Sequence, residues 1–327
     1  MLRVAIFRIF PVAVCVATMA GCATFRNTEP FPQAQKDVSI RVSQELPSTW
    51  TEMPTGVYAV PNSRLFVSGH QSAQAVGLLL GPVGVLLGSA INAERGKNLV
   101  GDGSAVAKQD LAAATEGFVK DGLAADPNTN LKFGNAGAGA SQLELLPFAV
   151  LSYINETDVR PYVIVRTTLK DATGKEVWSS RYISASAEAR PFGGDNGWYK
   201  DDGSSLKLAL SQSLKRSVDV MLSDVSGKTS RNATKWMYVS GQYVFVKQPL
   251  KLKSNPVVED PDYIAFTPHI GDVNVFAGVS IFDRRIVSIT EATEQDPNFT
   301  SVDKPSPDAA KSGDAAGTTV SAVQAGK

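Results

Sequence analysis

Residues 143–225 restrict the possible folds of this chain more than any other stretch. Residues 143–153 are an apolar run, and residues 159–170 alternate between apolar and polar side chains, which is the pattern of a strand. One side of that alternation is formed by Val163, Val165, Thr167 and Leu169. The tetrapeptide Asp171-Ala172-Thr173-Gly174 has the composition of a hairpin turn, and residues 175–187 are expected to run back beside the preceding strand.

A long helix is predicted to follow the hairpin. Residues 204–225 carry apolar side chains at helical spacing, namely Leu206, Leu210, Leu214, Val218, Met221, Leu222 and Val225. Gly227 is expected to end this helix. An earlier helix is predicted over 101–126, with Asp102 or Ser104 as its N-cap. Strands, hairpin and helices together predict an α+β fold, in which helices pack on an antiparallel sheet.

The rest of the chain divides by composition. Residues 236–295 contain about five short extended segments separated by turn residues, which predicts a small all-β domain, a barrel or a sandwich. Residues 301–327 lack aromatic, Leu and Ile side chains, and we expect them to be disordered. The expected organisation is a signal peptide (1–21), a tether (22–36), an α+β domain (37–230), the small β domain (236–295) and a tail (301–327).

The N-terminus has the pattern of a secretory signal. Arg3 and Arg8 precede the charge-free run Ile9–Met19, and small residues follow it. The run is 11 residues long, whereas a membrane-spanning helix needs about 20. We therefore expect a cleaved export signal and not a permanent transmembrane segment.

The end of this signal, Met19-Ala20-Gly21-Cys22, resembles the lipobox of bacterial lipoproteins. The resemblance implies cleavage before Cys22 and attachment of acyl chains, palmitate among them, to that cysteine. Ala23 takes the place of the Asp that retains such proteins at the inner membrane of enteric-type bacteria. The resemblance therefore implies a lipid anchor in the outer membrane, with the body facing the periplasm. The alternative is an ordinary cleaved signal with Cys22 as an incidental thiol.

Residue counts argue against several kinds of chemistry. Cys15 and Cys22 are the two cysteines, and His70 and His269 are the two histidines, so disulfides and the usual zinc sites are not expected. The 32 basic and 32 acidic residues balance, which argues against a nucleic-acid partner. Phosphate-loop and nucleophile-elbow motifs are not found. We predict no metal, no cofactor and no enzymatic activity.

An uncharged, glycine-rich segment, residues 75–91, stands out in the body of the chain. Two pairs of glycines lie four residues apart, a spacing that allows close helix approach in membranes; they are Gly77 with Gly81, and Gly84 with Gly88. One interpretation is a hairpin that dips into a membrane or forms an oligomer contact. The other is an apolar lid packed on the core of the protein itself.

The loop over residues 190–203 combines aromatic and acidic side chains. The aromatic residues are Phe192, Trp198 and Tyr199, which either contact a partner or lipid or cover the end of the core. The acidic residues are Asp195, Asp201 and Asp202; they either form a paired-carboxylate site or cap the helix that follows.

The segment Asp171-Ala172-Thr173-Gly174-Lys175-Glu176-Val177-Trp178, followed by a strand and a long helix, carries a weak family resemblance. It is similar to envelope lipoproteins of the curli-secretion type and of the ABC-transport-auxiliary type, over roughly residues 38–225. Those proteins have an α/β domain akin to the N-terminal domain of the Tol-system propeller protein. They are structural or transport components, so the resemblance implies no catalytic residue.

Two hypotheses about function remain open. The first is a non-enzymatic envelope lipoprotein, a structural or transport-accessory component that contacts envelope proteins or a second copy of itself. Its candidate contact surfaces are the Gly77–Gly88 segment and the 190–203 loop. The second is a ligand-binding lipoprotein whose C-terminal β region holds glycan, lipid or peptide.

Overall fold

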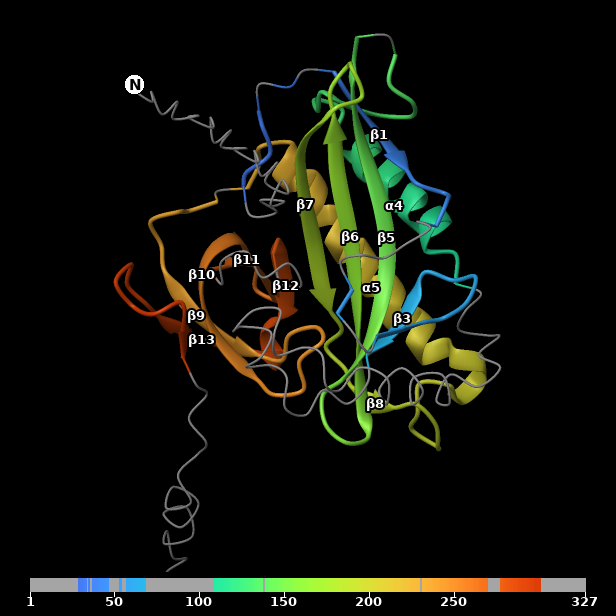
Figure 1. The fold of residues 1–327 in the computed structure, drawn as a ribbon, viewed down its shortest axis with the longest axis vertical. Coiled ribbons are helices and arrows are strands. Elements are labelled where there is room, and N and C mark those ends of the chain that lie inside the picture. The colour runs from blue at the N-terminus through green and yellow to red at the C-terminus, as the bar shows by residue number, and fades with distance from the viewer. Residues whose placement is uncertain are drawn as a thin grey trace, which may run out of the picture.

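The computed structural model describes residues 29–33, 35, 37–46, 53–54, 57–68, 109–137, 139–229, 231–269 and 277–300. Within these ranges the chain forms an open mixed sheet and two α-helices, α4 (Leu111–Ala125) and α5 (Lys200–Val225) (Figure 1). This confirms a mixed α+β fold. Neither helix is long and apolar enough to cross a membrane.

The strands, in chain order, are β1 (Val38–Val42), β2 (Val57–Ala59), β3 (Leu65–Ser68), β4 (Leu131–Phe133), β5 (Ser141–Tyr153), β6 (Asp158–Lys170), β7 (Glu176–Ala185), β8 (Arg190–Pro191), β9 (Met237–Gly241), β10 (Leu250–Glu259), β11 (Tyr263–Pro268), β12 (Val279–Asp283), β13 (Ser288–Glu291) and β14 (Phe299–Thr300). A 3₁₀ turn, η2 (Arg284–Ile286), links β12 to β13. The predicted hairpin is confirmed as β6 and β7.

Strand pairing corrects the predicted sheet in two ways. The main path runs β13-β9-β10-β11-β12-β7-β6-β5-β1-β4, and β12 lies parallel to β7, as β1 does to β5. The sheet is therefore mixed and not antiparallel. Because β12 pairs with β7, the described C-terminal strands belong to this sheet and do not form a separate barrel or sandwich. The outer edge of β7 has backbone groups that need partners, and β12 supplies them.

Both faces of the central strands are buried. On β6, Val163 and Val165 point into a core shared with α4 and α5, whereas Tyr162 and Ile164 point into a second core. The C-terminal strands and the 242–248 loop form the other wall of that second core. In Figure 1, α4 and α5 lie behind β5, β6 and β7, and the C-terminal strands lie beside β7. The sheet thus turns back over its own face, opposite the helices.

The two helices differ from prediction mainly at their starts. The N-cap of α4 is Asp110, whose carboxylate accepts from the Ala113 backbone N–H at 2.9 Å; residues 101–108, with the predicted caps, lie outside the described ranges. Helix α5 includes the predicted span and ends at Gly227, where φ is +70°. There Lys228 N–H donates to the Ser223 carbonyl, which closes the helix as a Schellman motif.

A buried ion pair ties the end of α5 to the sheet and to the chain that follows. The Asp224 carboxylate accepts from Tyr182 Oη at 2.6 Å, from Thr229 Oγ1 at 2.8 Å and from both Arg231 Nε, at 2.8 Å, and Arg231 Nη2. Burial alone raises the pKa of Asp224, but the hydrogen bonds and charge of Arg231 outweigh it, so the pKa is lowered. Asp224 therefore remains ionised inside the protein.

We predict that Gly278→Ala destabilises the protein by about 2 kcal/mol or more. At Gly278, φ is +131° and an added Cβ would lie 2.4 Å from the Arg181 carbonyl oxygen, where β12 joins β7. Gly174→Ala is the matched control, because φ is +83° there but nothing lies within 4 Å of the added Cβ. Thermal unfolding should show the larger loss for Gly278→Ala; equal losses would mean that the close approach is unimportant.

We predict that Asp224→Asn lowers the free energy of unfolding by about 3–5 kcal/mol, because it removes the buried carboxylate that pairs with the largely buried Arg231. Asp219→Asn, which breaks an exposed pair with Lys215 on the same helix, should cost no more than about 1 kcal/mol. Urea unfolding measures both changes.

The dependence of stability on pH should also reveal the contribution of the Asp224–Arg231 pair. The folded pKa of Asp224 is lowered, so its contribution is complete above the ordinary carboxyl pKa of about 3.9 and is lost as pH falls through the folded value. The wild type should therefore lose stability more steeply below about pH 4 than Asp224→Asn. Parallel curves would contradict a depressed pKa.

Candidate functional site

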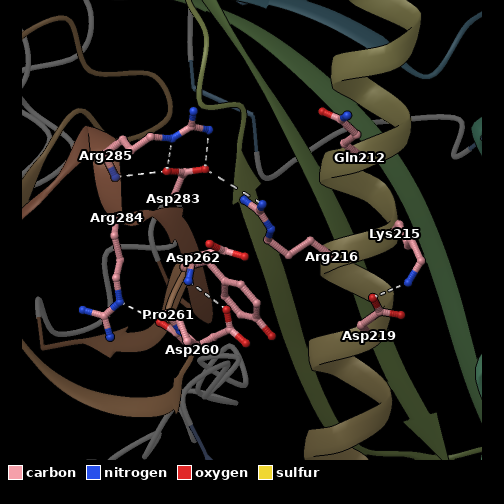
Figure 2. A pocket seen from close by; sticks show the side chains of 11 residues that line it. Gln212, Lys215, Arg216, Asp219, Asp260, Pro261, Asp262, Asp283, Arg284 and Arg285 are labelled. Carbon is pink, nitrogen blue, oxygen red and sulfur yellow. Dashed lines mark hydrogen bonds and ion pairs between the residues drawn. The ribbon is translucent and has the colours of Figure 1, made fainter.

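A charged groove lies between α5 and the β11–β12 edge of the sheet, with a volume of about 800 Å³ (Figure 2). We call it the α5 groove. It is lined by Gln212, Lys215, Arg216, Asp219, Asp260, Pro261, Asp262, Tyr263, Asp283, Arg284 and Arg285. Four of these side chains are cationic and four are carboxylates.

Three segments build the α5 groove. Gln212, Lys215, Arg216 and Asp219 occupy positions i, i+3, i+4 and i+7 and share one face of α5. The turn between β10 and β11 supplies 260–262, and the end of β12 with the 3₁₀ turn η2 supplies 283–285. Antiparallel pairing of Tyr263 with Asp283 brings these last two segments side by side.

Asp283 is the electrostatic centre of the groove. Its side chain is only 6% exposed, and both of its oxygens accept from the Arg285 guanidinium at 2.9 Å. Arg216 lies 4.0 Å from the same carboxylate, and Figure 2 shows the two arginines reaching it from two sides. The hydrogen bond from Arg285 is the main reason that the pKa of Asp283 is lowered.

Arg216 also links the helix to the strands. Its guanidinium lies 5.2 Å from the ring centre of Tyr263, within the range of a cation–π contact. One arginine of α5 therefore contacts both β11 and β12. These two contacts hold the α5 side of the groove against the β11–β12 side.

The other charged residues of the groove make contacts near its rim. Lys215 pairs with Asp219 at 2.7 Å, and Arg284 Nε donates to the Asp260 carbonyl at 2.7 Å. The Asp260 carboxylate accepts from the Asp262 backbone N–H at 2.9 Å. A partner with charged groups of both signs can pair with these rim residues. Among the described residues, no group of three or more His, Cys, Asp or Glu side chains is placed to hold a metal ion.

The structure places the aromatic residues of the 190–203 loop in the core. Trp198 is fully buried and donates its indole N–H to the Val159 carbonyl at 2.7 Å. Phe192 is buried and Tyr199 is half-buried against the same core. Their side chains thus cover the end of the core, the second of the two interpretations given above.

The acidic residues of that loop lie apart from the α5 groove. Asp195, Asp201 and Asp202 are exposed, and none of them lines the groove. Asp202 pairs with Lys207 at 3.3 Å. Asp201, Asp202 and Gly203 have left-handed backbone angles at the start of α5.

Several predicted sites lie outside the described residues. These are Cys22 and the glycine-rich segment with Gly77, Gly81, Gly84 and Gly88. The last described residue before that segment is Ser68, at the end of β3, which pairs with Ser152 near the end of β5.

The α5 groove is not predicted from the sequence. Residues 260–262 fall among the turn residues expected between the C-terminal extended segments, and Arg216 falls within the helix predicted over 204–225. The acidic turn and the arginine pair after β12 are visible in the sequence, but their meeting with α5 depends on the β12–β7 pairing, for which there is no local signal.

Comparison with known protein families and with curated proteins finds no match for this chain. Among solved structures, the crystal structure of the rare lipoprotein B from Shewanella oneidensis is similar over 37% of this chain and 87% of that chain, with 12% sequence identity and a TM-score of 0.28. A TM-score this low does not establish a shared fold.

We predict that Arg285→Gln raises the pKa of Asp283, because it removes the hydrogen bonds that lower it. Lys215→Gln, in the same groove but paired with Asp219, should leave that pKa unchanged. NMR titration of the carboxyl carbon measures both. An unchanged Asp283 pKa in Arg285→Gln would show that Arg285 does not hold the carboxylate in solution.

Proposed function

We propose that this chain is a lipid-anchored, non-enzymatic component of the bacterial envelope that binds a protein partner through the α5 groove. The residues up to Cys22 support export and acylation, and Ala23 supports an outer-membrane location facing the periplasm. The body then acts as a contact surface held at the membrane. The observation that carries the binding role is the ionised, arginine-paired Asp283 in the groove.

The pKa values in the groove favour binding over proton transfer. A general acid or base works best with a pKa near the operating pH. The pKa of Asp283 is lowered and that of Arg285 is raised, so both move away from neutrality. Fixed charges of this kind suit recognition of oppositely charged groups on a partner.

A second observation favours a ligand-binding role for the C-terminal strands. A hollow of about 220 Å³ is lined by Pro30, Arg231, Ala233, Asn255, Pro256, Val257, Thr267 and His269. His269 hydrogen-bonds to Asn255 and packs on Trp236 with the ring centres 4.7 Å apart. An apolar hollow with a few polar groups suits a small glycan, lipid or peptide fragment.

Photo-cross-linking in native membranes tests the proposed role. A photoreactive residue at Gln212, in the groove, should capture a defined envelope protein or a second copy of the chain. The same residue at Ser211 is the matched control, because Ser211 is also exposed on α5 but does not line the groove. No difference between the two positions would exclude the α5 groove as the contact surface.

A second measurement separates the anchor from the groove. Cys22→Ala should abolish acylation and release the protein from membranes, as read by mass spectrometry and fractionation. If the wild-type chain carries no acyl group, the lipoprotein role is wrong. If the purified protein binds peptidoglycan or lipid without any protein partner, and His269→Ala abolishes that binding, the ligand-binding role replaces partner binding through the α5 groove.

A further inference from the structure

The described N-terminal residues, 29–33 and 35, are docked on the body. The indole N–H of Trp178 donates to the Glu29 carbonyl at 3.0 Å. Phe31 meets the Trp178 ring edge-on, with the ring centres 5.1 Å apart, and is only 4% exposed. Phe31 belongs to the main core, so Glu29 and Phe31 are held against the body.

The docking continues across one end of the sheet. Ser141 Oγ donates to Gln35 Oε1 at 2.9 Å. A Cβ added to Gly227 would lie 2.7 Å from Gln33 Oε1, so the segment passes directly over the end of α5. We call this region, formed by the 171–175 turn, Trp178 and 226–228, the anchor end.

The length of chain before Glu29 limits the distance to the bilayer. Six residues separate Cys22 from Glu29, and a fully extended chain spans at most about 3.3–3.6 Å per residue. An acylated Cys22 therefore lies within about 25 Å of Glu29. This step depends on the acylation proposed above.

The 190–203 loop lies at the opposite end of the sheet. On β6, Leu169 pairs with Trp178 and Val159 pairs with Arg190 of β8. The ten residues between these positions span about 33 Å at 3.3 Å per residue. Figure 1 shows the β6–β7 turn and β8 at opposite ends of the long strands.

From this geometry we infer that the anchor end faces the lipid surface and that the 190–203 loop points away from it. The orientation comes from the short docked segment and not from charge. Two exposed lysines near the anchor end pair with acids, Lys132 with Asp37 and Lys228 with Asp126. Such a balanced surface gives no strong electrostatic attraction to lipid headgroups.

The same orientation places the α5 groove on the side of the protein, away from the bilayer. Ile281 of β12 pairs with Ser184 of β7, which is six residues and about 20 Å along the strand from Trp178. Asp283 lies two residues further along β12. At this level the groove is reachable by a periplasmic partner.

Energy transfer on vesicles tests the orientation. After processing, Cys22 is the only native cysteine and is acylated, so one added cysteine can be labelled selectively. The full chain, purified in lipidated form with either Thr173→Cys or Asp195→Cys carrying a donor, is added to preformed phosphatidylethanolamine–phosphatidylglycerol vesicles with a headgroup acceptor. We expect transfer from position 173 to exceed that from position 195 by about two-fold or more. Equal transfer, or the reverse order, overturns the inference.

Two controls separate the possible failures. Mass spectrometry of the same samples reports acylation, so a chain without acyl groups contradicts the proposed function, whereas an acylated chain with the wrong order contradicts only the orientation. Phe31→Ser should release the docked segment and bring the two transfer values together. Phe299→Ser, which changes a partly exposed aromatic side chain of β14, should leave their ratio unchanged; loss of the difference there as well overturns the role of docking.

Discussion

Apolar side chains on both faces of β5, β6 and β7 require that both faces be covered. Helices α4 and α5 cover one face, and the C-terminal strands turn back over the other. A helix layer alone would leave Tyr162 and Ile164 in water, and each large apolar side chain so exposed costs about 1.5–3 kcal/mol. The Asp224–Arg231 pair lies where α5 ends and the chain continues towards the C-terminal strands. It therefore connects the helices that cover one face to the strands that cover the other.

The α5 groove follows from how these layers meet. Pairing between β12 and β7 covers only the three positions from Val279 to Ile281. Beyond it, β12 no longer hydrogen-bonds to β7, and Asp283 reaches the level of α5 beside Arg216. Side chains at such a junction are partly shielded from water, which makes the Asp283 ion pairs stronger than fully exposed ones. The groove is thus a boundary between two layers that carries charge of both signs.

The sequence predicts those parts of the structure that depend on neighbours in the chain. The Asp171–Gly174 turn, the β6–β7 hairpin and the end of α5 at Gly227 have local signals, and all are confirmed. Long-range pairing has no such signal. The parallel contact of β12 with β7 was therefore missed, and with it both the mixed sheet and the α5 groove. The burial of Trp198 likewise depends on Val159, which is distant in sequence.

The β12–β7 contact also affects the order in which the chain folds. Val279 and Tyr182 are about 97 residues apart, so closing this contact carries a large loop-closure entropy and is slow. A chain is synthesised from its N-terminus, so β7 is available before its partner strand β12 exists. During that interval the edge of β7 and the uncovered face of β5 and β6 can pair with other chains. These surfaces of the new chain stay open to such contacts until its C-terminal strands arrive.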